Sequence, residues 1–309
     1  MKNFIITIDT ESDNQWSKNS VLSTKNAEFI PRFQNLCEKY CFKPVYLTDY
    51  SMANNDYFIK YIKEKQDSGL CEVGMHLHAW DTPPICSKDH YSDNKPYLIE
   101  YTYEQMYDKI AKLTDVLENK LCKKMTSHRA GRWATDDRYF EILEQLGYTI
   151  DCSVTPGIDW SSHVGYSIGG SDYSKSCTSP FYLSKNCQLL EVPMSIRSFR
   201  TPVSLKQPQL RNILKSIKRS LTIRNVWLRP SIHTNEEMFA LLKLIEKETT
   251  NYAQFMMHSS EFMPGGSPYF TNETAIDQMF LSLESFFEYV QQSYQSITLH
   301  DYYNQYTRK

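Results

Sequence analysis

Short runs of apolar residues alternate with longer amphipathic stretches along almost the whole chain. The short runs are mostly apolar throughout, as the buried strands of a parallel sheet are. Alternation of such runs with helix-like stretches is typical of βα units. We therefore predict an α/β protein with strands at residues 4–9, 44–48, 71–76, 125–129, 148–153, 189–194, 226–229 and 254–258.

Apolar residues at helical spacing fill the intervals between these runs. The predicted helices include 29–40, 106–117, 139–146 and 276–287, and we interpret 276–287 as the last helix of the chain. Thr102 with Gln105 and Thr234 with Glu237 match capping boxes, and Gly147 marks a helix end. The pattern predicts an incomplete parallel (β/α) barrel with about seven or eight strands.

Two long segments, 79–101 and 155–186, interrupt the alternation. Each directly follows a predicted strand, so in a parallel barrel both would lie over the carboxyl ends of the strands, where loops build sites. No repeat, low-complexity tract or linker divides the sequence. We predict a single domain over residues 1–309.

Composition and charge exclude several classes of partner. The chain has 309 residues, is 41% hydrophobic and carries a formal net charge of −2 with both signs interspersed, so no basic surface for nucleic acid or anionic lipid is expected. The first residues do not form a signal peptide, and no run is long and apolar enough for a transmembrane segment. The eight cysteines form no CxxC pair. We expect reduced thiols and a cytoplasmic protein.

Asp9 and Glu11 stand at the end of the first predicted strand. If the strand continues, residues two apart share one face. Two carboxyl groups so near each other are hard to ionise together unless a cation lies beside them. One carboxylate can then hold a metal ion while the other accepts a proton. The alternative is an ordinary polar strand end.

His76 and His78 end the third predicted strand. Their spacing presents two imidazoles to one metal ion on an extended backbone. The alternative is one core histidine and one loop histidine. A carboxylate pair at another strand end favours the metal interpretation, because three mixed ligands with an open position form a catalytic site.

Arg129 ends a further strand. A guanidinium beside a carboxylate lowers the pKa of that carboxyl and orients it, which suits a general base. Arg132 and Trp133 follow in the sequence and either contact substrate or form a solvated turn.

His258 ends the last predicted strand and is placed to protonate a leaving amine, with Glu261 as an orienting partner. The rival histidine, His300, lies near the end of the chain and is expected to be peripheral. Three other histidines are assigned surface or structural roles, namely His90, His163 and His233. The sequence contains no Gly-rich phosphate loop and no Gly-x-Ser-x-Gly elbow.

These four segments, in this order, resemble the signature motifs of the polysaccharide deacetylase (carbohydrate esterase) superfamily over roughly residues 4–266. The chain departs from the usual pattern in two places. It has Asp9-Thr10-Glu11 instead of adjacent aspartates, and His76-x-His78 instead of His-x-x-x-His. This variant is similar to deacetylase-like proteins of bacterial surface-polysaccharide gene clusters.

The resemblance implies a role for each residue: Asp9 as general base, Arg129 as its support, His258 as general acid, and Glu11, His76 and His78 as metal ligands. It implies a divalent metal, most simply zinc, since two histidines and one carboxylate suit that ion. The implied reaction is removal of an N-acetyl or other N-acyl group from a sugar of a surface polysaccharide, such as lipopolysaccharide or capsule, or from a precursor, including a lipid-linked one. Trp80, Trp133 and Trp160 offer surfaces for stacking on a sugar ring, or pack in the core.

Three other functions share these features. A different amide or formamide hydrolase would use every residue above. A non-catalytic sugar-binding module would keep the aromatic loops and lose the metal or the acid. A glycosidase using Asp9 and Glu11 as its two carboxylates would cleave a glycosidic bond and release no acetate.

Overall fold

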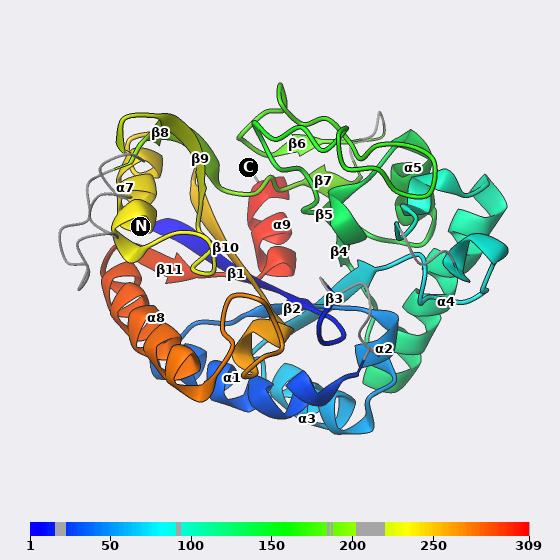
Figure 1. Ribbon diagram of the computed structural model, residues 1–309, viewed down its shortest axis with the longest axis horizontal. Coiled ribbons are helices and arrows are strands. Elements are labelled where there is room, and N and C mark those ends of the chain that lie inside the picture. Colours follow the sequence, from blue (N-terminus) through cyan, green and yellow to red (C-terminus); the bar gives the residue numbers. More distant parts are fainter. Residues whose placement is uncertain (16–22, 91–93, 184–185, 187, 202–219, 309) are drawn as a thin grey trace.

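Mostly parallel strands form one curled sheet in the computed structural model, which describes residues 1–15, 23–90, 94–183, 186, 188–201 and 220–308 (Figure 1). The strand order is β10-β1-β2-β3-β4-β5-β7-β6, with β11 beside β1, and every pairing but β6–β7 is parallel. The predicted incomplete (β/α) barrel is confirmed. The strands are β1 (Lys2–Thr10), β2 (Val45–Thr48), β3 (Glu72–Leu77), β4 (Ser127–Ala130), β5 (Ile150–Asp151), β6 (Phe181–Tyr182), β7 (Leu190–Glu191), β8 (Ile196–Arg200), β9 (Ile223–Trp227), β10 (Tyr252–His258) and β11 (Tyr294–Ser296).

Helices cover the outside of the curled sheet, and those labelled α8, α1, α3 and α4 form an arc around the strands in Figure 1. The α-helices are α1 (Ile30–Lys39), α2 (Tyr50–Ala53), α3 (Asp56–Asp67), α4 (Tyr103–Leu121), α5 (Asp137–Gln145), α7 (Asn235–Ile245), α8 (Glu273–Ser293) and α9 (Leu299–Thr307). Short 3-10 turns are η1 (Lys25–Phe29), η2 (Ser87–His90), η3 (Leu98–Glu100), η4 (Gly131–Trp133) and η5 (Ser259–Phe262). In the part of the chain described, no helix is both long and apolar enough to cross a membrane.

The residues predicted to begin and end helices do so in the structure. Thr102 and Thr234 each accept a hydrogen bond from the backbone N–H three residues later, and the Gln105 and Glu237 side chains bond back, so both capping boxes are confirmed. Gly147 follows the end of α5 with φ +88°, the left-handed conformation that glycine adopts without strain.

Alternate residues of β1 face opposite sides of the sheet. Phe4, Ile6 and Ile8 pack in the large core between the sheet and the outer helices, whereas Ile5 packs inside the curl. Residues of α9 belong to this inner cluster, so this helix closes the curl at the end where β1 begins. The inward positions of β1 therefore lead from apolar Ile5 to Asp9 at the opposite end.

Two predictions about elements are wrong. The run 226–229 was expected to be a parallel barrel strand, but β9 pairs antiparallel with β8 in a separate two-stranded sheet. One backbone hydrogen bond, from the Met256 N–H to the Leu228 carbonyl and 3.0 Å long, joins the end of this run to β10. In addition, 276–287 is not the last helix, because α9 follows α8. The segment that forms α9 is largely polar and buries only Leu299 and Tyr302, so its apolar periodicity is weak.

Candidate active site

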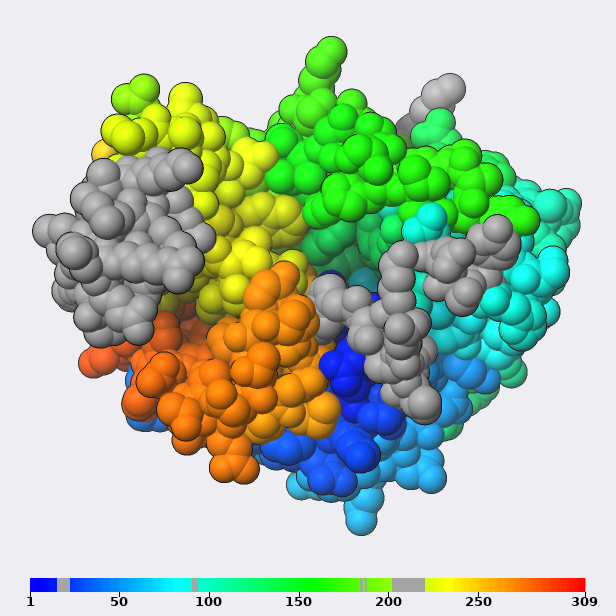
Figure 2. All heavy atoms as spheres, in the orientation of Figure 1, coloured from blue at the N-terminus to red at the C-terminus, as the bar shows by residue number. Residues whose placement is uncertain are grey.

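The carboxyl ends of several strands meet at one cavity of about 590 Å³. Strand register places the candidate residues side by side, because Asp9 of β1 is level with His258 of β10, and His76 of β3 is level with Arg129 of β4. Figure 2 shows the surface hollowed near its middle, where blue, green and orange segments meet. Residues of both long predicted loops line the cavity, including Trp80 and Trp160.

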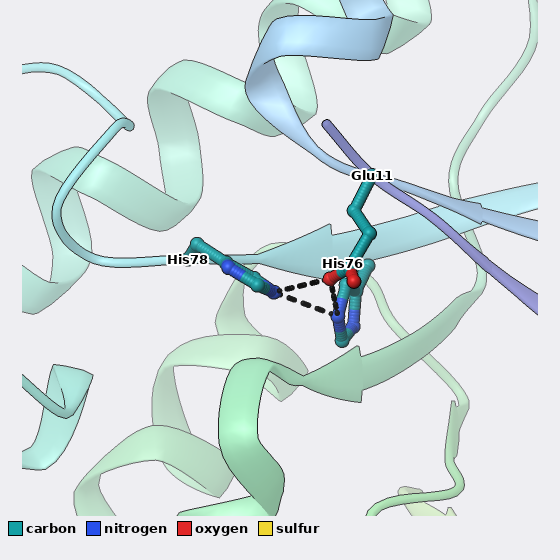
Figure 3. A group of neighbouring side chains, drawn as sticks. All are labelled: Glu11, His76 and His78. Atoms are coloured by element: carbon teal, nitrogen blue, oxygen red, sulfur yellow. Dashed lines mark hydrogen bonds and ion pairs between the residues drawn. The ribbon is translucent and has the colours of Figure 1, made fainter. Parts of the chain in front are cut away.

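Glu11, His76 and His78 converge on one point (Figure 3). Glu11 Oε2 lies 3.6 Å from His76 Nε2 and 3.1 Å from His78 Nε2, and the two Nε2 atoms are 2.9 Å apart. All three side chains are buried, and their potential ligand atoms lie within 4.8 Å of one another. Asp9, the alternative carboxylate ligand, bonds to Arg129 instead.

The ring orientations fit a cation at this point. His76 Nδ1 lies 3.0 Å from the Arg129 carbonyl oxygen, to which only a protonated Nδ1 can donate, so the neutral ring presents the lone pair of Nε2 to Glu11 and His78. Burial lowers the pKa of His78 to about 4, which keeps that ring neutral. Burial also opposes a charge on His76, but the negative charges of Asp9 and Glu11 outweigh it and raise the pKa of His76. A cation here would take the place of that proton.

Arg129 fixes the position of Asp9 through a hydrogen bond. Its Nη1 donates to Asp9 Oδ1 at 2.5 Å, its Nη2 donates to Thr7 Oγ1 at 2.9 Å, and its Nε donates to the Cys152 carbonyl at 3.2 Å. Burial favours the neutral form of Asp9, but the positive charges of Arg129, His76 and His258 reverse this and lower its pKa. Asp9 is therefore ionised at neutral pH and fixed in orientation.

His258 lies across the cavity from the two histidines. Its Nε2 is 3.8 Å from Asp9 Oδ2 and 4.0 Å from Glu11 Oε1. Its Nδ1 is 3.2 Å from Nη2 of Arg229 and 3.6 Å from Glu261 Oε2. Glu261 accepts the backbone N–H of His258 at 2.9 Å and lies 3.6 Å from Arg229 Nη2.

Aromatic and cationic side chains form the walls. The ring of Trp80 contacts that of His78 at 4.4 Å between centroids, and Arg129 lies 5.1 Å from the Trp133 ring. Trp160 donates through Nε1 to Thr155 Oγ1 at 2.8 Å. With Arg132, these tryptophans place all four predicted substrate-contacting residues on the cavity wall.

Comparison with known proteins shows likeness of structure alone. No family model matches the chain, and no curated protein sequence matches it either. A 4-alpha-glucanotransferase from Thermococcus litoralis superposes with a TM-score of 0.59 at 14% identity, over 99% of this chain and 40% of that protein. A GH57-type branching enzyme from Pyrococcus horikoshii gives 0.56 at 12% identity, over 99% of this chain and 70% of the enzyme. The chain shares their fold.

A polysaccharide deacetylase fold is also among the similar structures. A protein described as a putative polysaccharide deacetylase from Mycobacterium smegmatis gives a TM-score of 0.48 at 12% identity, over 96% of this chain and 94% of that one. This chain spans two fifths of the length of the glucanotransferase, so the activity of that longer enzyme does not transfer with the fold.

Arg229 is a residue of the site that sequence analysis missed, and Lys95 of the 79–101 segment is another. Arg229 stands at the end of the predicted run 226–229, the same kind of position that singled out Asp9 and His258, and this was a signal that could have found it. His163 was assigned a surface or structural role, yet it lines the cavity.

The remaining histidines lie elsewhere. The His300 backbone N–H donates to Glu72 at 2.9 Å, and its Nδ1 is 3.2 Å from Thr126 Oγ1. Both partners stand at the beginnings of strands, so His300 is at the opposite end of the sheet from the cavity. His233 is buried beside Glu237, 3.2 Å away in α7, and His90 is exposed in η2.

Proposed function

We propose that the chain is a metal-dependent hydrolase that removes an N-acetyl or other N-acyl group from a sugar of a bacterial surface polysaccharide or its precursor, in the cytoplasm. The observation that carries this proposal is the convergence of Glu11, His76 and His78 beside an Arg129-bound Asp9 and opposite His258. Acyl transfer to water needs a ligand set, a base and an acid at one point, and the cavity provides residues suited to all three.

Glu11, His76 and His78 would hold the metal, which we propose to be zinc. A divalent ion bound there supplies Lewis-acid polarisation of the acyl carbonyl and a lower pKa for water. Asp9 accepts the proton of the attacking water through Oδ2, the oxygen that Arg129 Nη1 does not occupy. Because Arg129 also fixes the carboxylate, Asp9 meets the water in a constant orientation.

His258, in its imidazolium form, gives the Nε2 proton to the leaving amine and is left as neutral imidazole; Nε2 faces the acidic side of the cavity. An amine departs poorly without a proton, so this step decides whether an amide can be cleaved. On the other side of the ring, Nδ1 faces the Glu261 carboxylate at 3.6 Å, which favours the charged ring, and Arg229 can donate to Nδ1 once the proton has left.

A sugar ring suits the walls, since indole faces stack on the apolar faces of sugars and guanidinium groups bind hydroxyls. One of the structures with this fold is named as a 4-alpha-glucanotransferase, in agreement with a carbohydrate substrate.

The glycosidase alternative fits less well. A glycosidase needs one carboxylic acid that stays protonated near neutral pH. Burial favours that form for both candidates, but Arg129 lowers the pKa of Asp9, and the histidines lower that of Glu11 well below its usual value. Both carboxyls are therefore ionised.

The proposal is tested by metal analysis of the purified protein together with a screen of N-acylated sugars for release of acetate or formate. We expect about one divalent ion per chain, lost in His76→Ala and His78→Ala because each removes a ligand. His300→Ala is the matched control and should keep the metal. Metal content like that of the unmodified chain in both ligand variants would refute the site, and a metal-free protein would favour a binding module.

A further inference from the structure

Two cationic side chains, Lys95 and Arg132, lie next to each other on one wall of the cavity. Arg132 Nη1 donates to the main-chain oxygen of Lys95, which joins the two residues. The Arg132 guanidinium lies 4.1 Å from the centre of the Tyr97 ring, and Lys95 Nζ lies 4.8 Å from that of Trp80. Both are partly buried, so two like charges are held together where water screens them less than at the surface.

Neither cation has an acidic partner within 4.0 Å among the described residues. Lys95 Nζ donates to the uncharged Gln15 Oε1 at 2.8 Å. The carboxylate whose charge acts on Arg132 is that of Glu100, and it is occupied by backbone N–H groups, namely those of Tyr97, Tyr166, Ser167 and Ile168. Among the described residues, neither cation therefore has a carboxylate in direct contact, and the negative charges of Asp81 and Glu11 act on Lys95 only from a greater distance.

Other cations around the site are paired. Arg129 bonds to Asp9, and Arg229 lies 3.6 Å from Glu261. Lys109, buried below the 79–101 segment, bonds to Asp89 at 2.9 Å. In the described part of the chain, the lack of a carboxylate in direct contact thus distinguishes Lys95 and Arg132 from the neighbouring cations of the same region.

The backbone around Arg132 is held in an unfavourable conformation. Arg132 has φ +55° and Trp133 has φ +63°, both in the left-handed region that side chains other than glycine disfavour. Two successive residues of this kind persist only where the surrounding structure enforces them, and such strain clusters at ligand sites. Here it places both side chains on the cavity wall.

We propose that Lys95 and Arg132 bind an anionic oxygen group of the substrate, a phosphate or a carboxylate, next to the sugar whose acyl group is removed. This inference rests on the proposed function, because it assumes that the sugar enters the same cavity. Trp80 contacts both His78 and Lys95, so the anion would bind close to the candidate metal ligands. A guanidinium and an ammonium side by side are a common means of binding such oxyanions.

Binding is measured by calorimetric titration at low ionic strength with three probes: glucose, glucose 1-phosphate and glucuronic acid. We expect at least one charged sugar to bind roughly 10-fold more tightly than glucose, and to lose this advantage in high salt because the attraction is between charges. Preference for the phosphate or for the uronate identifies the source of the anion.

Variants assign the preference to residues. In Lys95→Gln and Arg132→Gln we expect the charged sugar to bind about as weakly as glucose, whereas Lys95→Arg should retain most of the preference. Lys88→Gln is the matched control, because Lys88 belongs to the same 79–101 segment but bonds to the Glu100 carbonyl outside the cavity lining. With the described residues Lys95 makes a single side-chain hydrogen bond, to Gln15, so its variants test the proposal even if Arg132→Gln does not fold.

Equal affinity for glucose and both charged sugars in the unmodified protein would overturn the proposal, as would full preference in Lys95→Gln. Metal content and acyl release are measured on the same samples. Anion preference without any acyl release would count against the proposed reaction alone, and acyl release without preference would count against this site alone.

Discussion

Asp9 and Glu11 stand two residues apart, and their neighbours give them different environments. Arg129 occupies one oxygen of Asp9, whereas Glu11 faces two imidazole nitrogens. The same strand end can thus provide one carboxylate for a metal and another for a proton. His258 completes this arrangement from β10, level with Asp9 in the register of the sheet.

His258→Ala is predicted to retain metal and to lose amide-hydrolysing activity by about 10²-fold or more, the usual scale for removal of an acid–base group. The loss should be smaller for an activated aryl ester, because its leaving group departs with little need for a proton. Turnover of both substrates and metal content are measured on the same preparations.

His300→Ala is the control, since His300 lies at the opposite end of the sheet. It should change neither metal content nor activity. Full activity of His258→Ala on the amide, or a larger loss in His300→Ala, would show that another group supplies the proton.

The residues found from the sequence share one property: each stands at the end of an apolar run. This property sufficed to predict that Asp9, Glu11, His76 and His78 lie close together, because the carboxyl ends of parallel strands lie at one edge of the sheet. The position at a strand end did not predict which side chains contact each other. That Arg229 holds His258 depends on how the end of β9 approaches β10, which periodicity within one segment does not contain.

Among the elements, strand β3 and the turn after β4 approach each other closely beside the candidate metal ligands. A Cβ atom on Gly131 would lie 2.4 Å from the Leu77 carbonyl oxygen and 2.7 Å from His78 Cδ2. The backbone oxygen cannot move without disturbing β3, so the turn requires glycine for close packing.

Gly131→Ala is predicted to displace His78 and weaken metal binding by roughly 10- to 100-fold, the range seen when support of a metal ligand is lost. Overpacking should also lower the free energy of unfolding by about 1–3 kcal/mol. Chelator competition and urea unfolding measure the two effects.

Gly69→Ala is a suitable control. Gly69 has φ +68°, so alanine is strained there, but no atom of the described residues beyond its two chain neighbours lies within 4 Å of the new Cβ. This variant should lose stability and keep its metal affinity. If both variants lost metal equally, general destabilisation would explain the effect of Gly131→Ala.

The elements predicted best are those whose apolar runs are long or strictly periodic, such as β1, β10, α4 and α8. The runs 148–153 and 189–194 do form sheet strands, but pairing is confined to two residues each, in β5 and β7. β8, β11 and α9 were not predicted, because they are short or largely polar. The β8–β9 pairing was missed because an apolar run does not reveal whether its partner is parallel.

At the scale of the whole molecule, the curled sheet is closed at one end and open at the other. Leu299 and Tyr302 of α9 pack against the inner residues of the strands near the end where β1 begins. The cavity opens at the carboxyl ends. A buried polar group lies beside α5, where His128 Nε2 is 2.8 Å from the Tyr139 hydroxyl. In this group Asp151 Oδ1 is 2.6 Å from His128 Nδ1, and Ser153 and Glu191 are further neighbours of Asp151.

Glu191 gives the folded chain a predictable pH dependence. Burial, and then the negative charge of Asp151, raise the pKa of Glu191 well above its usual value. The folded chain therefore keeps a proton that the unfolded chain releases above a pH of about 4.3, the ordinary value for glutamic acid. The contribution of protonated Glu191 to the free energy of unfolding is complete below a pH of about 4.3. This contribution is lost as the pH rises through the pKa of Glu191 in the folded chain.

Glu191→Gln is predicted to remove this loss, because the amide mimics the protonated acid in shape and stays neutral. Urea unfolding at pH 4 to 8 should show a variant close to the unmodified chain near pH 4 and more stable by on the order of 1 kcal/mol near pH 7.

Asp151→Asn is the contrasting control. Burial favours its neutral form, but His128 lowers the pKa of Asp151, so its charged form stabilises the fold and this variant should lose stability at pH 7. The difference in free energy of unfolding between Glu191→Gln and the unmodified chain should change with pH. If it did not, packing and not the retained proton would account for the effect.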